Sequence, residues 1–406
     1  MIPKINIQDY TYTLSDDKIA KYPLPNREDS RILIFKHNSL DESKFSNLAG
    51  LLPSDSLLIF NKTKVVPARL LFRKPTGAHI EIFCLEPYYP NEYNLNFSST
   101  DNCSWIAVIG NAKKWKSGFL HFDTKGDSVL NQINLKAKLE QIIEDNYVVN
   151  FSWEGGISFS QVMEMCGKVP IPPYLNRDTQ LIDKERYQTL YASIKGSVAA
   201  PTAGLHFSQH VLDDIDKKGI KRGELVLHVG AGTFLPVKAN EISSHKMHSE
   251  LFSVEISMVR ALLEQVVAGN PVVAVGTTSV RTLESLYWIG LKCFNGLQPS
   301  DTEQWEPYSE SSTDVTPAQA LQSLVEWMES SNIHIMERKT RIIIIPGFKF
   351  RIVDILITNF HQPNSTLLLL IASFVGDYWK SIYSYALDNG FRFLSYGDSS
   401  VLFRLD

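Results

Sequence analysis

The stretch Val272-Val-Ala-Val-Gly-Thr-Thr-Ser-Val-Arg (272–281) decides the fold class. Its first four residues are apolar and mostly β-branched, a composition typical of a fully buried strand. Gly276 and three small hydroxyl residues then form a tight turn, and a helix is expected from about Val280. A strand, a turn of small residues and a helix make up the α/β unit in which ligands bind at the carboxyl ends of strands. The stretch therefore predicts an open α/β sheet with a site at that edge.

The chain after Gly155 continues this alternation of strands and helices. Val211, Leu212 and Ile215 share one helical face, and Gly219 suits the end of that helix. The longest apolar run, 366–375, has about half the length that a bilayer span needs, so a buried helix is expected there. Other helices are expected at 16–21, 258–267 and 317–329, and strands at 31–35, 56–60, 224–229, 341–345, 352–357 and 401–404.

The segment 67–155 has a different pattern, in which short alternating runs are separated by turn residues. Alternation with a period of two, interrupted by frequent turns, predicts an antiparallel sheet or a small barrel. One helix is expected within the segment, at 135–145. We therefore predict an inserted β domain at about 67–155. Its runs lie at 68–72, 80–85, 105–109, 119–122 and 148–153.

Length and charge limit the classes of function. With 406 residues, 44% of them hydrophobic, the chain is long enough for two domains with sizeable cores. A formal net charge of −4 argues against a protein that coats nucleic acid non-specifically, although not against one basic face. Two local basic clusters are most simply explained as solvated surface. They are Lys113, Lys114 and Lys116, and Lys217, Lys218, Lys221 and Arg222.

The cysteines and the first residues bear on the cellular compartment. Cys84, Cys103, Cys166 and Cys293 lie far apart without a C-x-x-C pair, so neither a zinc knuckle nor a disulfide framework is indicated. Reduced thiols in a cytoplasmic protein are the simplest explanation. The N-terminus lacks the apolar segment of a secretory signal. We expect a cytoplasmic monomer without membrane association.

Five of the ten histidines stand in short stretches rich in glycine or serine. Imidazole is the side chain that changes charge near neutral pH, so these five are candidates for general acid–base catalysis. For the first of them, a satisfied core histidine at a capped helix start is the simpler alternative. The five are His206, His228, His245, His248 and His361.

Residues beside two of these histidines suggest ligand contacts. Thr202 and Gly204 suit a loop whose backbone amides approach a ligand at a helix N-terminus. Gly230 and Gly232 follow a strand, where close approach of a ligand and a tight β-bulge are equally good explanations. These glycines do not complete a dinucleotide-binding fingerprint, because position 235 is leucine.

The stretch His245-Lys-Met-His-Ser-Glu (245–250) contains two histidines three residues apart. On a helix this spacing allows the two imidazoles to share a metal ion. The stretch has no H-E-x-x-H motif and no nearby cysteine, so no metal site is expected. Acid–base catalysis, or a hydrogen bond to substrate beside Glu250, is the better prediction.

Polar residues follow two of the expected strands. Thr277, Thr278 and Arg281 come after the strand 272–275. Arg281 is placed either to clamp a carboxylate or phosphate, or to form a surface ion pair with Glu284.

Asn359 and His361, with Ser365 shortly beyond them, come after the strand expected at 352–357. Polar residues at the end of a strand in an open α/β sheet are more often functional than structural. We therefore count Asn359 and His361 among the site residues.

Together these stretches resemble the S-adenosylmethionine:tRNA ribosyltransferase-isomerase family of queuosine biosynthesis. The likeness runs from end to end of the chain, and all the strings in this order are a very specific signal although each is weak alone. The strings are Tyr22-Pro-Leu, Asn61-Lys-Thr-Lys-Val-Val-Pro-Ala-Arg-Leu, Ile171-Pro-Pro-Tyr-Leu-Asn-Arg, Tyr187-Gln-Thr-Leu-Tyr-Ala, Ala199-Ala-Pro-Thr-Ala-Gly-Leu-His-Phe, His228-Val-Gly-Ala-Gly-Thr-Phe, His245-Lys-Met-His-Ser-Glu, Val275-Gly-Thr-Thr-Ser-Val-Arg-Thr-Leu-Glu-Ser, Thr358-Asn-Phe-His, Ser365-Thr-Leu-Leu and Ser395-Tyr-Gly-Asp.

The resemblance implies a fold and a reaction. Members of the family have a mixed-sheet α/β domain, here 1–66 and 156–406, interrupted by an inserted antiparallel β-barrel domain, here 67–155. S-adenosylmethionine serves as a ribosyl donor rather than a methyl donor, and no metal is expected. The partner is tRNA carrying 7-aminomethyl-7-deazaguanine at the wobble position of the anticodon. The implied products are epoxyqueuosine in tRNA, adenine and methionine.

That reaction makes demands that the candidate residues can meet. A base must remove a C5′ hydrogen that the sulfonium acidifies, and adenine leaves as an anion unless an acid protonates it. One histidine can serve as the base and another as the acid. The cationic sulfonium favours a carboxylate such as Glu250, or an aromatic face such as Phe207 or Phe234. Arg281 is placed to hold the methionine carboxylate.

Two positions depart from the usual pattern of the family. Position 62 is lysine where aspartate is common, and position 364 is asparagine where arginine is usual. These differences leave open a paralogue that uses the same donor on a different acceptor.

Two other classes of function remain as alternatives. A SAM-dependent RNA methyltransferase is the main competing enzyme, although the chain lacks a G-x-G-x-G signature after an early strand. A non-catalytic RNA-binding module is a further alternative, but such a module would usually be more basic.

Overall fold

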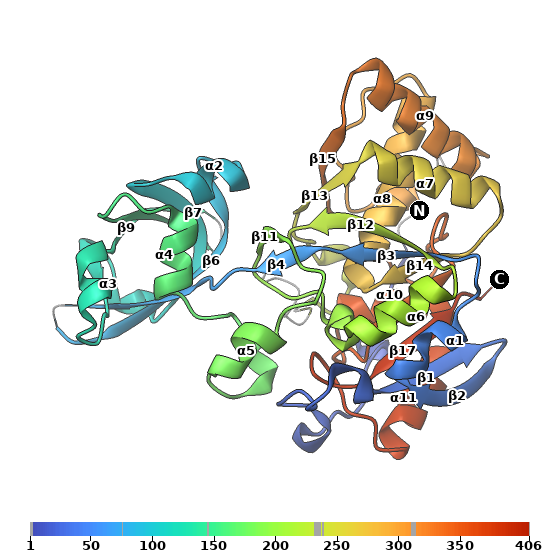
Figure 1. The fold of residues 1–406 in the computed structure, drawn as a ribbon, viewed down its shortest axis with the longest axis horizontal. Helices are drawn as coiled ribbons and strands as arrows, with labels where there is room; N and C mark the ends of the chain where they lie inside the picture. Colours follow the sequence, from blue (N-terminus) through green and yellow to red (C-terminus); the bar gives the residue numbers. More distant parts are fainter. Residues whose placement is uncertain are drawn as a thin grey trace.

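The computed structural model describes residues 3–74, 76–143, 146–230, 237, 239–309 and 314–405. These residues form an α/β domain with a nine-stranded mixed sheet, and a closed barrel of six antiparallel strands. In Figure 1 the barrel lies beside the main domain, and β4 (Thr63–Val65) and β11 (Ile194–Ser197) run between the two. The predicted fold class, a mixed-sheet α/β domain interrupted by an antiparallel barrel, is confirmed.

The large sheet is parallel at its centre and mostly antiparallel towards its edges, with one further parallel pair between β17 and β1. Val273 pairs with Leu58 on one side and with Ile355 on the other, both in parallel. Because the four central strands are parallel, their carboxyl ends meet at one edge of the sheet. The order across the sheet is β15 (Ile335–Thr340), β13 (Glu250–Glu255), β12 (Lys221–Leu227), β3 (Leu57–Asn61), β14 (Val272–Val275), β16 (Ile355–Asn359), β17 (Ser399–Phe403), β1 (Arg31–Lys36) and β2 (Ser39–Lys44).

Helices cover both faces of this sheet, which explains why its central strands are apolar throughout. Leu57 and Ile59 of β3 belong to one buried cluster, and Leu58 and Phe60 belong to the other. Fully burying one such side chain contributes about 1.5–3 kcal/mol. The first cluster includes residues of α7 (Ile256–Val267), α8 (Thr277–Phe294), α9 (Pro317–Ser330), α10 (Thr366–Val375) and α11 (Tyr378–Asp388), and the second includes residues of α1 (Leu48–Leu51) and α6 (Gln209–Lys217).

The barrel has its own apolar core. Ile80, Ile82 and Cys84 alternate inwards along β6, and α4 (Phe159–Cys166) adds further apolar side chains to the same cluster. The core therefore extends beyond the interval 67–155, whose boundaries stay a prediction. In barrel order the strands are β10 (Asn146–Ser152), β7 (Asn102–Gly110), β6 (His79–Tyr89), β5 (Arg69–Arg73), β8 (Phe119–Phe122) and β9 (Lys136–Ile143), and the accompanying helices are α2 (Tyr93–Ser98) and α3 (Ser128–Ile133). Helix α5 (Leu181–Arg186) bonds instead to the main domain, where Tyr396 donates to Asp183 at 2.8 Å.

Two expected elements are wrong. The helix expected at 135–145 is strand β9, which closes the barrel by pairing with both β8 and β10. The run 341–345 forms no strand, although its four isoleucines, 342–345, are buried and only Arg341 is exposed. Its N–H groups donate elsewhere, from Arg341 to the carbonyl of Thr302 at 2.9 Å and from Ile345 to the hydroxyl of Tyr308 at 2.9 Å. None of the helices in the described ranges has the length and apolar character needed to span a bilayer.

Candidate active site

A cavity lies at the carboxyl ends of β14 and β16, beside the first turn of α8. Its walls come from the segment after β11, from the β14–α8 turn, and from the residues that follow β16. This is the edge at which the sequence predicts a site. Five of the predicted site residues line the cavity, namely Thr202, Thr277, Thr278, Asn359 and His361.

Gly276 makes the sharp turn from β14 into α8 possible. Its φ is 87°, a left-handed conformation that glycine adopts without steric cost, and its N–H donates to the carbonyl of Ile357 at 2.8 Å. Among the described residues no side chain caps the start of α8. The N–H groups of Ser279 and Val280 donate to the carbonyl of Gly276, which leaves those of Thr277 and Thr278 for other partners. The turn brings Thr277 and Thr278 directly to the cavity wall.

Two buried oxygens in the cavity wall have no hydrogen-bond partner among the described residues. They are Oγ1 of Thr278 and the side-chain oxygen Oδ1 of Asn359. The large majority of buried side-chain polar atoms in native proteins are paired, so two unpaired oxygens in the wall of one cavity suit contact with a ligand.

His361 lines the cavity with an uncharged imidazole. Its Nε2 lies 2.9 Å from Oγ1 of Thr358, and its backbone N–H donates to the hydroxyl of Tyr383 at 3.0 Å. Burial lowers its pKa to about 3, because an imidazolium loses hydration there. His361 is therefore neutral at neutral pH, and the expected change of charge near pH 7 does not occur.

His206 lies behind the cavity wall rather than in it. The amide nitrogen of Asn359 donates to its Nε2 at 3.0 Å, so this imidazole fixes the orientation of a cavity residue. Burial, followed by the positive charges of Arg392 and Arg27, lowers the pKa of His206 to about 3. This histidine is also neutral near pH 7, contrary to the expectation from its sequence context.

His228, directly after β12, faces the barrel. Its ring stacks on Tyr93 of α2 with the centroids 4.1 Å apart and the planes 8° apart. Burial lowers the pKa of His228 to about 4. A Cβ at Gly196 would collide with this imidazole, so glycine there makes room for the stack. His228 is thus a packing contact between the two domains, and its neighbour Val229 lines the cavity instead.

His245 and His248 lie outside the cavity lining and not on a helix. They occupy the irregular segment between a short 3₁₀ turn, Ile242–Ser244, and β13. Burial, followed by the charge of His248, lowers the pKa of His245, and the carbonyl of His245 accepts from Gln304 at 2.7 Å. The helical i, i+3 geometry considered for a shared metal is therefore not present.

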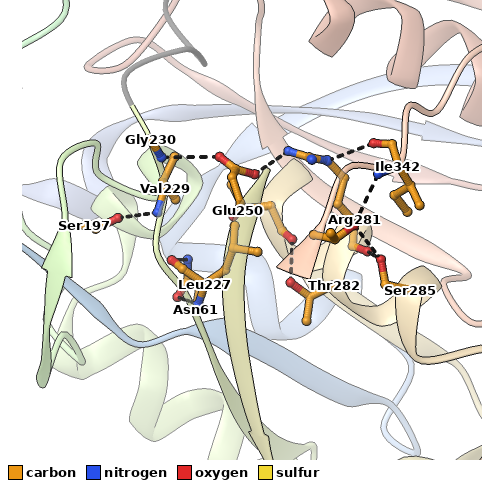
Figure 2. Close-up of polar contacts among 12 residues, drawn as sticks. Asn61, Ser197, Leu227, Val229, Gly230, Glu250, Arg281, Thr282, Ser285 and Ile342 are labelled. Carbon is orange, nitrogen blue, oxygen red and sulfur yellow. Dashed lines mark hydrogen bonds and ion pairs between the residues drawn. The ribbon is translucent and has the colours of Figure 1, made fainter. Parts of the chain in front are cut away.

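Glu250 and Arg281 form a buried ion pair (Figure 2), and neither residue belongs to the cavity lining. Nη1 of Arg281 donates to one carboxylate oxygen of Glu250, and the Gly230 N–H donates to the other at 3.4 Å. Nε of Arg281 donates to the carbonyl of Ile342 at 3.2 Å, and Nη2 is buried without a partner in the described part of the chain. The pair therefore neutralises both groups and leaves one guanidinium nitrogen for another ligand.

The alternative ion pair between Arg281 and Glu284 does not form. The Glu284 carboxylate accepts instead from the backbone N–H groups of Arg351, Ile352 and Val353, at 2.9, 3.1 and 3.0 Å. Burial raises the pKa of Glu284 to about 7 although these N–H groups favour its ionised form. Glu284 thus ties α8 to the segment that leads into β16.

Packing accounts for two other residues that the sequence suggested for the site. A Cβ at Gly204 would collide with the hydroxyl of Tyr191, so glycine there fits a close side-chain contact. Phe207 is fully buried against the rings of Phe45 and Phe60, at centroid distances of 5.0 and 5.1 Å. Gly232 and Phe234, also suggested for the site, lie outside the described residues.

Sequence reasoning missed several residues that build the cavity. Gly276 itself lines it, and the hydroxyl groups of Tyr174 and Ser395, both in the lining, lie 2.6 Å apart. Asn61, at the end of β3, both donates to and accepts from the backbone of Leu227, at 3.0 and 3.1 Å, and so joins the ends of β3 and β12 (Figure 2). The sequence did contain a signal for Asn61, Tyr174 and Ser395, because each lies in one of the strings that carry the family resemblance.

The two departures from the family pattern lie outside the cavity lining. Nζ of Lys62 pairs with Glu224 at 3.2 Å and with Glu255 at 3.7 Å, so neighbouring carboxylates balance its charge. Asn364 has a φ of 53°, a left-handed conformation that asparagine tolerates better than most residues. Its N–H donates to the carbonyl of Tyr10 at 3.0 Å.

Comparison with known proteins identifies the family. The family model described as queuosine biosynthesis protein matches residues 7–402. S-adenosylmethionine:tRNA ribosyltransferase-isomerases from Trichlorobacter lovleyi, Halothermothrix orenii and Legionella pneumophila are 34%, 35% and 35% identical to this chain, each over 98% of it and over 99%, 100% and 100% of their own lengths. The crystal structure of S-adenosylmethionine tRNA ribosyltransferase from Thermotoga maritima is 26% identical, covers 97% of this chain and 99% of its own, and has a TM-score of 0.47. The resemblance found in the sequence is thereby confirmed, and the chain belongs to the queuosine biosynthesis protein family as an enzyme of the transferase–isomerase kind.

Proposed function

We propose that this enzyme transfers and isomerises the ribosyl moiety of S-adenosylmethionine onto 7-aminomethyl-7-deazaguanine at the wobble position of tRNA. The products are epoxyqueuosine in tRNA, adenine and methionine. The names of the relatives support the donor and the kind of acceptor. The observation that carries the proposal is the polar lining at the parallel strand ends, where oxygens of Thr278 and Asn359 are buried without a partner in the described residues. We place the reaction in the cytoplasm, which suits four cysteines that are all unpaired.

The donor fits the residues that line the cavity. A nucleoside offers hydroxyl and amino groups to Thr278 and Asn359, and the first turn of α8 offers backbone N–H groups. Behind the lining, Nη2 of Arg281 has no partner among the described residues and is assigned to the methionine carboxylate, while Glu250 supplies negative charge for the sulfonium. In this arrangement Thr202 and Thr277 complete the wall, and no metal takes part.

We assign the removal of the C5′ proton to His361. Of the five candidate histidines, all of which the structure describes, it alone lines the cavity. Its imidazole is unprotonated at neutral pH, which is the state that a base requires, but a pKa of about 3 makes it a weak base, because proton transfer is most efficient when the pKa of the base lies near the operating pH. His206 serves as a positioning residue through Asn359. An imidazole with a pKa of about 3 does not carry a proton to give, so protonation of the leaving adenine falls to a different donor.

Product analysis tests the proposal. The enzyme is incubated with S-adenosylmethionine and precursor tRNA, and the nucleosides and small products are identified by mass spectrometry. Adenine, methionine and an epoxy-cyclopentenediol increment on the nucleoside are expected. S-adenosylhomocysteine with a methyl increment would show a methyltransferase, and adenine release only with another RNA would show a paralogue with a different acceptor.

A further inference from the structure

A second, narrower cleft lies beside the cavity, on the other side of His206. Arg27, Arg186 and Arg392 contribute to its walls, together with His206 itself. Ser395 lines both the cleft and the cavity, and His206 bonds to Asn359 of the cavity. The cleft and the cavity are therefore neighbours that share Ser395 as a lining residue.

Arg27 and Arg186 are half-buried and bind backbone carbonyl groups rather than carboxylates. Arg27 donates to the carbonyls of Leu205 and Glu185 at 3.0 and 3.1 Å. Arg186 donates to the carbonyls of Pro25 and Leu24 at 2.9 and 2.8 Å, while its Nε is buried without a partner in the described ranges. Burial and then the positive charge of Arg186 lower the pKa of Arg27, so the two guanidinium groups repel each other.

The carboxylates near the cleft are already occupied or exposed. Asp183 pairs with Arg177, and Asp398 accepts from Arg392 and from two backbone N–H groups. Glu28 accepts from the hydroxyl of Ser208. The charge of Glu185 offsets that of Arg27, but its side chain is exposed to solvent. The walls of the cleft thus retain an excess of positive charge.

A purely structural role explains only part of this arrangement. The four hydrogen bonds to carbonyls tie the N-terminal segment to the residues around Glu185 and Leu205. They leave Nε of Arg186 unsatisfied and two like charges together, both of which cost free energy. An anion in the cleft offsets the repulsion between the two charges, and the planar guanidinium fork suits the oxygens of a phosphate.

We propose that this arginine cleft binds a phosphate diester of the RNA backbone while the reacting nucleotide occupies the adjacent cavity. The inference rests on the proposed function for its choice of RNA. Arg27 and Arg186 form no ion pair within the described part of the chain, and two such guanidinium groups suit a phosphate diester in a polyanion better than the single carboxylate of the donor, which we assign to Arg281. The basic cluster around Lys217 is a weaker candidate, because Lys217 and Arg222 are paired with Asp214 and Asp216.

Equilibrium binding of a fluorescent anticodon stem-loop RNA tests the proposal without turnover. We expect Arg27→Gln combined with Arg186→Gln to weaken RNA binding about tenfold at low salt, and to reduce the slope of log affinity against log salt by about one. Arg260→Gln is the matched control, because Arg260 is exposed and paired with Glu329 on the far helices, and it should bind RNA normally. The KM for S-adenosylmethionine should not change in the double variant.

Chemical modification of the unaltered enzyme covers the case in which the double variant fails to fold. We expect RNA to protect Arg27 and Arg186, but not Arg260, from phenylglyoxal. Wild-type affinity and salt slope in a folded double variant, or equal modification with and without RNA, would overturn the proposal. A raised KM for S-adenosylmethionine with unchanged RNA binding would also overturn the proposal, because it would show that the cleft binds the carboxylate of the donor. Because these readouts need no product, they stay distinct from failure of the ribosyl-transfer proposal.

Discussion

Thr278 and Thr282 stand one turn apart on α8 but use their hydroxyl groups differently. Oγ1 of Thr282 donates to the carbonyl of Thr278 at 3.2 Å, within the helix. Oγ1 of Thr278 faces the cavity and has no partner among the described residues. At the scale of single residues, the hydroxyl group of Thr282 therefore serves the helix, whereas that of Thr278 is left for a ligand at the cavity wall.

Thr278→Val removes this hydroxyl while keeping the shape of the side chain. The free energy of unfolding should stay within about 0.5 kcal/mol of the wild type, because no bond in the described structure is lost. The KM for S-adenosylmethionine should rise about tenfold, the equivalent of one hydrogen bond. Thr282→Val is the matched control and should cost about 1 kcal/mol of stability with an unchanged KM. An unchanged KM in both variants would show that the Thr278 hydroxyl does not contribute to binding of S-adenosylmethionine.

Glu250→Gln tests the buried ion pair. The side chains of Glu250 and Arg281 are only 5% and 10% exposed, so removing one charge leaves the other buried and uncompensated. We expect a loss of about 3–5 kcal/mol in the free energy of unfolding, measured by urea titration. Adding Arg281→Met to this variant should restore part of the loss. Strictly additive effects of the two substitutions would show that the pair is not energetically coupled.

The sequence predicted much of the cavity wall, because polar residues that directly follow an expected strand can be recognised in the sequence. Thr277, Thr278, Asn359 and His361 all follow strands whose carboxyl ends meet. His228 also follows a strand, yet it stacks on Tyr93 of the barrel. A local pattern shows where a strand ends but not which distant ring lies opposite, so the histidine-centred interpretation grouped side chains that the fold separates.

At the scale of elements, Glu284 links α8 to the backbone before β16. Its folded pKa of about 7 lies above the ordinary value of 4.5, so the unfolded state releases this proton first as the pH rises. Its contribution to stability is complete below pH 4.5 and is lost as the pH rises through 7. Between pH 5 and 8 the wild type should lose about 2 kcal/mol from this group. Urea titrations of Glu284→Gln at both pH values should lack that loss, and an identical pH dependence in the variant would contradict the assignment.

Elements with a strong apolar pattern were predicted well, and those whose structure depends on distant partners were not. Val272–Val275 is a strand and Thr366–Val375 a buried helix, as their apolar composition indicated. In β9 only Ala137 is fully buried, so alternation is weak and barrel closure decides the conformation. The run 341–345 had the composition of a strand, but its N–H groups donate hydrogen bonds to the loop around Thr302 and Tyr308 rather than to a neighbouring strand.

At the scale of the whole molecule, the stack of His228 on Tyr93 joins the sheet to the barrel. The folded pKa of His228, about 4, lies below the ordinary value of 6.5, so protonation favours the unfolded state. Its contribution to stability is present above pH 6.5 and is lost as the pH falls towards 4. From pH 7 to 5 this loss should be about 2 kcal/mol. His228→Phe, which keeps an aromatic ring, should show a smaller decrease in unfolding free energy over that range, and an equal decrease would exclude this histidine as the cause.

The chain enters the barrel through β4 and leaves it towards β11, and these two segments pair in parallel beside each other. Both ends of the chain lie in the main domain (Figure 1). Tension applied to the two termini is therefore carried by the main domain and reaches the barrel only after that domain has opened. In an optical trap the barrel should therefore unfold as a separate event after the main domain, because the main domain carries the force until it opens.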